Sequence, residues 1–303
     1  RPETVERIKT GRKTGPAAET AGREIREEKI MYKIIACDLD ETLLGSNREI
    51  PERNIEAIRK ATAMGVKFVP ATGRGYNSVE DTLKELGLFE KEGEYVISYN
   101  GGAITENKGS RLLHFDGLPF ELAEQLYKRG MNYDVCIHVY TKDMVYAYNI
   151  TQEEIKYLSK RMKVTETFEK DLGFLAGQDI VKVLYVNTDY AYLRKIEEEL
   201  KDITGDVDVS FSSNRYIEFN HKGVNKGAGL RFIAHMLGVK PEETIAIGDN
   251  FNDLPMIQAA GLGVGVQNTI KDMKPLCGYI TEATNDEGAV AEVIEKFILQ
   301  AKQ

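Results

Sequence analysis

The feature that most constrains the fold is an alternation of short apolar runs with amphipathic stretches, which begins near Met31 and returns near the end of the chain. The first block runs from the apolar segment Ile34–Leu39 to Tyr95–Tyr99, and the second covers about Lys226 to Leu299. Apolar runs separated by helical periodicity are typical of parallel strands covered by helices on both faces. The pattern therefore predicts an α/β fold with a doubly wound, Rossmann-like parallel sheet.

The middle of the chain has a different pattern. Asn100-Gly101-Gly102 is a hairpin signal, and the strands expected after it are rich in Val and Tyr. Helical patterns interrupt these strands. We interpret this block as an α+β domain inserted into the parallel-sheet domain. The predicted divisions are an N-terminal appendage at residues 1–30, a first part of the core at 31–105, the inserted domain at 106–221 and a second part of the core at 222–303.

The composition limits the class of partner. The formal net charge of −8 opposes the broad basic surface that neutralises a nucleic-acid backbone. No apolar stretch approaches the roughly 18 residues of a membrane span. The three cysteines are widely spaced and lack the CxxC pattern of zinc or dithiol sites, which favours a reducing cytoplasm. We therefore expect a cytoplasmic protein whose partner is a small molecule, neither a nucleic acid nor a membrane.

Acidic side chains follow two of the expected parallel strands. Asp38 and Asp40 come directly after the first apolar run, and Asp249 and Asp253 follow the late strand Thr244–Ile247. Open α/β sheets bind ligands at the carboxyl ends of their strands. Two acidic strand ends in one sheet indicate a hard cation such as Mg²⁺, which prefers oxygen ligands. Taken singly, these aspartates could instead be turn or helix-cap residues.

Groups suited to a phosphoryl anion lie at the same predicted edge. Thr72-Gly73-Arg74 follows the apolar run Val66–Ala71 and offers a hydroxyl, an accessible backbone N–H and a guanidinium. Lys226 opens an expected helix in the returning block, where its ammonium could meet an anion. In isolation, Thr72 could be a plain helix cap and Arg74 a solvated charge.

Together these segments resemble the haloacid dehalogenase superfamily of phosphotransferases. The match rests on Asp-Leu-Asp-Glu-Thr-Leu-Leu at 38–44, Thr-Gly-Arg at 72–74, Asn-Lys-Gly at 225–227 and Gly-Asp-Asn-Phe-Asn-Asp-Leu-Pro-Met at 248–256. The long insertion after the third strand, together with Ser-Tyr-Asn-Gly-Gly-Ala at 98–103, resembles the Cof-type subfamily with a type IIB cap. Glu41 departs from the pattern, because the family most often has Gly at that position.

The resemblance implies a Mg²⁺-dependent phosphatase that hydrolyses a small phosphorylated metabolite, such as a sugar phosphate or a phosphorylated cofactor, through an aspartyl-phosphate. Asp38 would be the nucleophile and a metal ligand, and Asp40 the acid and base, with its carbonyl on the metal. Asp249 would complete the protein ligands, with Asp253 in support. The phosphoryl oxygens would be held by Thr72, Gly73, Arg74, Lys226 and Asn252. A sugar phosphomutase and a non-catalytic phosphoryl-binding module remain as alternatives.

Overall fold

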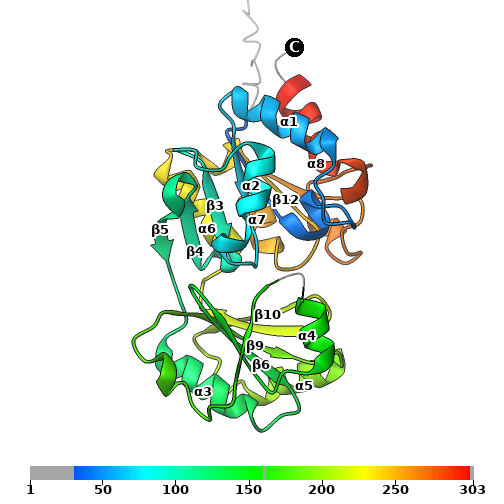
Figure 1. Ribbon diagram of the computed structural model, residues 1–303. Helices are drawn as coiled ribbons and strands as arrows, with labels where there is room; N and C mark the ends of the chain where they lie inside the picture. Colours follow the sequence, from blue (N-terminus) through cyan, green and yellow to red (C-terminus); the bar gives the residue numbers. More distant parts are fainter. Residues whose placement is uncertain (1–30, 160–161, 301–303) are drawn as a thin grey trace, which may run out of the picture.

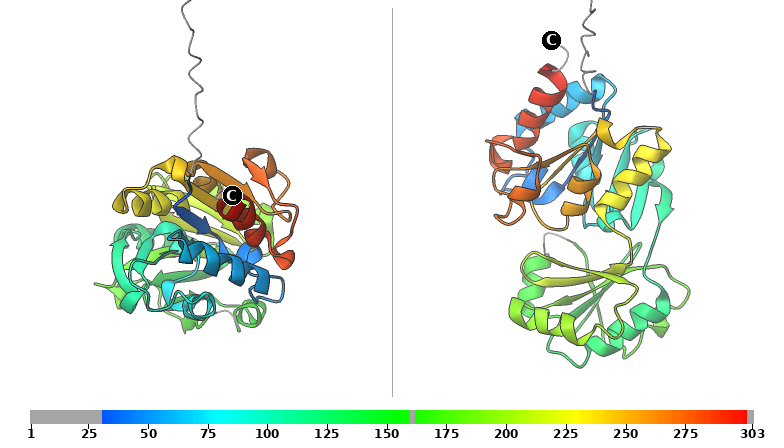
Figure 2. Two further views of the ribbon diagram at one scale, coloured as in Figure 1. Left: turned by 90° about the horizontal axis from the view of Figure 1, so that it is seen from above. Right: turned by 180° about the vertical axis from the view of Figure 1, so that it is seen from behind.

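The computed structural model describes residues 31–159 and 162–300, so the appendage expected at residues 1–30 lies outside the described residues. The described chain forms two lobes joined by two connecting segments (Figures 1 and 2). We call the lobe that holds both chain ends of the described part the core, and the other lobe the cap. The chain enters the cap after residue 115 and returns to the core after residue 221.

The core is built on a five-stranded parallel sheet in the order β14-β13-β12-β1-β2. Its central pair joins distant parts of the chain, with Ile34 opposite Thr244 and Cys37 opposite Ile247. This pairing confirms the predicted α/β core with a parallel sheet. The bounds are β1 (Ile34–Cys37), β2 (Lys67–Pro70), β12 (Thr244–Gly248), β13 (Leu262–Gly265) and β14 (Tyr279–Ile280).

Helices cover both faces of this sheet. Alternate side chains of β1 enter two separate apolar layers, because successive residues of a strand point to opposite faces. Ile35 packs in the layer that includes α1, α2 and α8, whereas Ile34 packs in the layer that includes α6 and α7. The helices are α1 (Glu52–Ala63), α2 (Glu80–Leu86), α6 (Lys226–Met236), α7 (Leu254–Ala259) and α8 (Ala289–Ile294), which η9 (Glu295–Leu299) continues.

A small antiparallel sheet extends the core beside β2. It consists of β3 (Tyr95–Ser98), β4 (Ala103–Glu106) and β5 (Arg111–Phe115), and a single parallel bridge joins Ala71 to Ile97. The expected end of the first core part, residue 105, falls before β5, which nevertheless pairs with β4. We therefore propose that the boundary lies near residue 116, ahead of α3. We did not predict β5 from the sequence, because its side chains are exposed or partly buried and show no clear alternation of apolar and polar residues.

The cap contains a six-stranded sheet in the order β10-β11-β9-β6-β7-β8. Helices α3 (Phe120–Gly130) and α5 (Tyr190–Glu199) pack on the face directed away from the core (Figure 1), and α4 spans Gln152–Leu158. The opposite face is therefore directed at the core. The strands are β6 (Cys136–Thr141), β7 (Val145–Tyr148), β8 (Thr165–Thr167), β9 (Ile180–Val186), β10 (Val207–Ser212) and β11 (Tyr216–His221).

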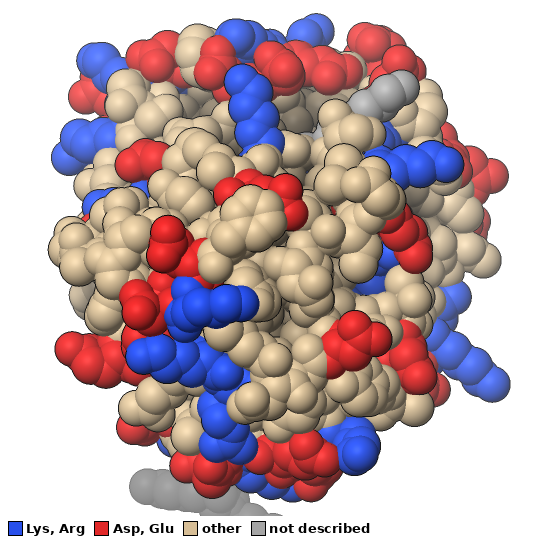
Figure 3. All heavy atoms as spheres, turned by 60° about the horizontal axis from the view of Figure 1, so that its bottom comes forward, with Lys and Arg blue, Asp and Glu red and all other residues tan. Residues whose placement is uncertain are grey.

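The outer surface of the cap carries charges of both signs. In the space-filling view, Lys and Arg side chains lie interspersed with Asp and Glu (Figure 3). Arg129 of α3 forms an ion pair with Asp202, which lies in the turn after α5. Among the described residues, no helix has both the length and the apolar character that crossing a membrane requires.

Candidate active site

The carboxyl ends of β1 and β12 bring the first and last acidic motifs together. Asp38 directly follows β1, and its backbone N–H donates to the carbonyl of Ile247 on β12 at 2.9 Å. Asp249 directly follows β12. Gly248, at the end of β12, leaves room for this turn, because a Cβ placed there would lie 2.4 Å from the Cβ of Asp253. The turn therefore closes tightly over the end of the strand.

Lys226 lies at the centre of a buried charge cluster. Its Nζ lies 2.5 Å from Oδ1 of Asp38 and 2.6 Å from Oδ1 of Asp253, and its side chain is fully buried. The helix start fixes this position, because Oδ1 of Asn225 accepts from the N–H of Ala228 and caps α6. The cluster thus joins residues from both blocks of the core.

Asp253 shapes the cluster through both of its oxygens. While Oδ1 accepts from Lys226, Oδ2 accepts from the backbone N–H groups of Asp249 at 2.9 Å and Asn250 at 3.2 Å. The carboxylate is fully buried. It therefore ties the lysine to the turn after β12.

The acidic groups of the cluster fit a divalent cation. Carboxylate oxygens of Asp38, Asp249 and Asp253 all lie within 4.8 Å of one another. Three carboxylates face one ammonium, so the buried site carries excess negative charge that a cation would balance. Thr42 orients one ligand by donating its hydroxyl to Oδ1 of Asp249 at 3.0 Å. Buried carboxylate oxygens are ligands that hard divalent cations, Mg²⁺ among them, prefer.

The pKa values of the cluster reflect the same excess charge. Burial, with the neighbouring Asp253, raises the pKa of Asp38 to about 7 although Lys226 opposes the shift. Burial and the charges of Asp38 and Asp253 raise the pKa of Asp249 to about 9. Burial lowers the pKa of Lys226, but Asp253 and Asp38 outweigh it, so the pKa ends above its ordinary value. The lysine is therefore a cation at neutral pH, whereas the carboxyls of Asp38 and Asp249 bind protons more tightly than ordinary aspartates, and a metal ion would compete with those protons.

Asp40 lies apart from this cluster and pairs with Arg74. The guanidinium donates from Nε to Oδ2 at 2.8 Å and from Nη2 to Oδ1, which gives a two-pronged contact. Thr72 supports the same loop, because its Oγ1 accepts from the N–H of Arg74 at 3.0 Å. The structure thus directs Arg74 at the carboxylate of Asp40.

Of the remaining residues expected at the site, some lie beside the acidic loop and one does not contact the charge cluster. Thr72 and Gly73 lie at the end of β2, beside the loop that carries Asp40. Asn252 lies in the turn between β12 and α7 and is partly buried. Within the residues that the structure describes, its side chain forms no hydrogen bond with the four charged groups Asp38, Lys226, Asp249 and Asp253. The structure therefore does not join Asn252 to the cluster.

Glu41 adopts a backbone conformation that explains the family preference for glycine. Its φ of 60° and ψ of 13° lie in the left-handed region, which a non-glycine residue enters at a cost. The backbone carbonyl accepts from Nδ2 of Asn268 at 2.8 Å, and the side chain is exposed. The departure at this position therefore places local strain in the loop between Asp40 and Thr42.

Four residues near the site were not identified from the sequence. Thr42 contacts Asp249. Lys182 contacts the carbonyl of Gly73 and Glu218 contacts Asn100, so these residues join the cap to the core. Thr42 belongs to the first acidic motif, so its place beside the two aspartates could have identified it as a site residue. Lys182 and Glu218 interrupt otherwise apolar strands, which is a weaker signal because a charged residue in a strand is usually solvated.

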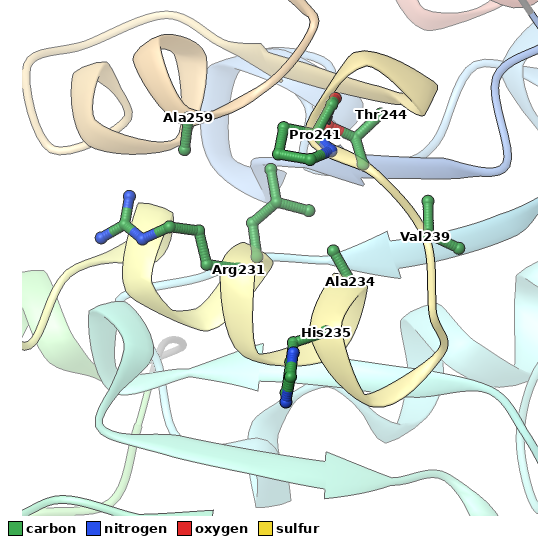
Figure 4. Close-up of a pocket in the computed structure, with 8 residues that line it drawn as sticks. Arg231, Ala234, His235, Val239, Pro241, Thr244 and Ala259 are labelled. Carbon is green, nitrogen blue, oxygen red and sulfur yellow. Dashed lines mark hydrogen bonds between the residues drawn. The ribbon is translucent and has the colours of Figure 1, made fainter.

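A cavity of about 260 Å³ lies elsewhere in the core, where β12 begins rather than where it ends. Figure 4 shows the small apolar side chains of Ala234, Val239 and Pro241 around it, while the ring of His235 points away from Pro241. None of the residues lining it belongs to the charge cluster. The site described above is therefore separate from this cavity.

The sequence profile of the haloacid dehalogenase-like hydrolases matches residues 35–294. The chain belongs to this family. The Bacillus subtilis (strain 168) protein YxeH is 32% identical over 270 residues, which is 89% of this chain and 99% of YxeH. From the same organism, 5-amino-6-(5-phospho-D-ribitylamino)uracil phosphatase YcsE is 30% identical and covers 91% of this chain and 99% of its own length. The resemblance inferred from the motifs is confirmed.

Solved structures agree with this assignment. A haloacid dehalogenase-like hydrolase from Bacteroides thetaiotaomicron is 33% identical, with a TM-score of 0.76 over 88% of this chain and 100% of that chain. The fold of a core with a separate cap is thereby confirmed. The chain is a hydrolase of this family, and phosphoric monoester hydrolysis is the class of reaction that the family and these relatives support.

Proposed function

We propose that the protein is a Mg²⁺-dependent phosphatase that hydrolyses a small phosphorylated metabolite through a phosphoryl-aspartate on Asp38. The observation that carries the proposal is the buried contact of Lys226 with Asp38 and Asp253, at a strand edge that also presents Asp249. An attacking carboxylate and a phosphate repel each other, and this arrangement supplies positive charge where they meet. The name of YcsE supports a substrate in which phosphate is esterified to a sugar-like chain.

Asp38 would attack the phosphorus atom in the first step. One of its carboxylate oxygens forms the new P–O bond while the bond to the leaving oxygen breaks. Asp38, Asp249 and Asp253 would hold the metal, with the backbone carbonyl of Asp40 as a further ligand. Bound Mg²⁺ would neutralise charge on the phosphoryl oxygens. Lys226, Thr72 and the N–H of Gly73 would bind the same oxygens, and Asn252 would join them only after its turn moves.

Asp40 would transfer the protons of both steps. It donates a proton to the leaving oxygen, then accepts one from the water that attacks the phosphoryl-aspartate, so that inorganic phosphate leaves and Asp38 is restored. When Asp40 carries a proton, its hydroxyl oxygen is a weaker acceptor than a carboxylate oxygen, so the contact of Arg74 with both oxygens weakens. We therefore expect Arg74 to release one oxygen of Asp40 when substrate binds, which frees part of its guanidinium for the phosphoryl group.

A phosphate-release screen tests the proposal. Purified protein is assayed with sugar phosphates, sugar-alcohol phosphates, nucleotides, pyridoxal phosphate and flavin mononucleotide, with Mg²⁺, with Ca²⁺ or with excess chelator. We expect release with Mg²⁺ and little with Ca²⁺, because the longer and more flexible coordination of Ca²⁺ would misplace Asp38 relative to phosphorus. Transfer between two positions of one sugar without release would identify a phosphomutase. No turnover of any compound would favour the non-catalytic binding module.

A further inference from the structure

We propose that Lys182 and Glu218 of the cap form a latch that couples docking of the cap to the position of the core loop at residues 72–74. The two residues lie on neighbouring strands, β9 and β11, with Nζ of Lys182 2.6 Å from Oε2 of Glu218. The effect of the latch on turnover rests on the proposed function. The contacts themselves are independent of it.

The pair is buried on the sheet face that is directed at the core. Lys182 is 2% exposed and Glu218 is 5% exposed, whereas the neighbouring Val183 and Phe219 point into the apolar layer under α3 and α5. Alternation along a strand therefore places the two charges on the opposite face. A buried ion pair is tolerated only when further hydrogen bonds satisfy its remaining atoms. The role of the Lys182–Glu218 pair therefore depends on which groups hydrogen-bond to its remaining polar atoms.

Some of those partners come from the core. Nζ of Lys182 donates to the carbonyl of Gly73 at 3.2 Å, and Nδ2 of Asn100 donates to Oε2 of Glu218 at 3.3 Å. Within the cap, the hydroxyl of Ser212 donates to Oε1 of Glu218. The hydrogen bonding of the pair is therefore completed only when the two lobes are docked.

The core segments that receive these contacts are joined to each other. The N–H of Asn100 donates to the carbonyl of Thr72 at 2.9 Å, and the N–H of Tyr99 donates to the carbonyl of Arg74 at 2.9 Å. Tyr99 and Asn100 have φ values of 51° and 55°, a region that few non-glycine residues occupy. Such a conformation persists only where surrounding contacts hold it. The latch supplies one of these contacts, from Glu218 to Asn100, and a second contact, from Lys182, holds Gly73 in the adjoining loop.

The latch is connected, through Gly73 and Arg74, to Asp40, the acid and base of the proposed reaction. Gly73 precedes Arg74, whose guanidinium holds both oxygens of Asp40. A shift of the loop on cap release would move this guanidinium. The polar atoms of Lys182 and Glu218 already have protein partners, so we assign them a positioning role rather than a contact with substrate. Docking of the cap would then set the geometry of Asp40.

Hydrogen exchange tests the latch without any substrate. The double variant Lys182→Met/Glu218→Met removes both charges, so neither is left buried alone. Arg129→Met is the matched control, because it removes a cap ion pair on the face away from the core. We expect at least about tenfold faster exchange of the amides of Arg74, Tyr99 and Asn100 in the double variant, with α1 unchanged and the control like wild type.

Two exchange results would overturn the latch. One is wild-type protection at those three amides in the folded double variant. The other is faster exchange of similar size throughout both lobes, which would indicate general destabilisation instead of a local coupling.

Turnover of p-nitrophenyl phosphate gives the second readout. A loop displaced by about 1 Å can cost on the order of 10²-fold in rate, so we expect kcat to fall by that order in the double variant while KM changes little. Lys182→Arg keeps the charge and should recover at least part of the loss. A wild-type kcat in the double variant would refute the coupling. If the wild-type protein showed no turnover but the amides of Arg74, Tyr99 and Asn100 exchanged faster in the double variant as expected, the proposed function would be wrong and the latch would still be supported.

Discussion

The ammonium of Lys226 lies 2.5 Å from Oδ1 of Asp38, although 188 residues separate the two in the chain. Asp38 follows the central strand β1, and Lys226 begins helix α6 in the second part of the core. The pairing of β1 with β12 brings these blocks together. The contact between the two side chains is therefore a direct product of the doubly wound fold, and most predictions about the site depend on it.

Replacing Lys226 with Met should lower kcat/KM by about 10²–10³-fold, because one preorganised donor to developing negative charge contributes about that much. Lys222→Met is the matched control. Lys222 is an exposed lysine four residues earlier whose Nζ donates to the carbonyl of Gly205. Steady-state kinetics on both folded variants provide the comparison. Equal activity of Lys226→Met and Lys222→Met would remove Lys226 from the mechanism.

Stabilisation by Mg²⁺ should increase as the pH rises from 6 to 9. The pKa values of Asp38, about 7, and Asp249, about 9, lie above the ordinary value near 4. Over this interval the folded metal-free protein holds protons that the unfolded chain has lost, so these groups lower its stability as the pH rises. The metal needs both carboxyls deprotonated, so it competes with fewer protons at high pH.

The measurement is Tm with excess Mg²⁺ minus Tm with chelator, taken at several pH values across this range. Asp249→Asn serves as the control and should flatten the dependence, because one of the two titrating ligands is gone. A Tm difference that is constant, or largest at pH 6, would contradict the assigned metal site.

Glu41→Gly should stabilise the protein by roughly 0.5–1 kcal/mol. A non-glycine residue in the left-handed region costs about 1–2 kcal/mol, and the greater freedom of glycine in the unfolded chain offsets about 0.5–1 kcal/mol of that. Glu41→Ala is the matched control, since it removes the same side chain without relieving the backbone. Urea unfolding of the three proteins measures the difference. If the two variants changed the free energy of unfolding equally, the effect would belong to the side chain and not to φ.

The sequence predicted those features of the fold and the site that a single local segment marks, such as a motif after a buried strand. It did not predict features that depend on how distant segments pack. Asp38 and Asp249 follow buried strands, so the parallel sheet alone placed them together. Glu41 stands at a position where the family prefers glycine, and its positive φ gives the physical reason. The contact of Lys182 with Gly73 could not be predicted, because it depends on how two lobes dock. Strand β5 was missed because its pairing with β4, rather than an apolar pattern, defines it.

The central claim is that Asp38 becomes phosphorylated while Asp40 transfers protons. Asp38→Asn should abolish the phosphoryl-enzyme, because an amide is a poor nucleophile and lacks the charge that helps hold the metal. Asp40→Asn should keep the attacking carboxylate and lose about 10²–10⁴-fold in turnover. With an activated acyl or aryl phosphate, whose leaving group needs little protonation, the first step can proceed in Asp40→Asn while water attack stays slow.

Rapid quenching followed by intact mass and peptide mapping tests this claim most directly. Wild type and both variants are mixed with Mg²⁺ and an activated acyl phosphate, and folding is checked separately. We predict that phosphoryl-enzyme accumulates in Asp40→Asn, maps to Asp38, and is absent from Asp38→Asn. The contrary result is a folded Asp38→Asn that still turns over, with no phosphoryl-aspartate trapped in wild type or Asp40→Asn. That outcome would replace the nucleophile by direct attack of water on the phosphorus.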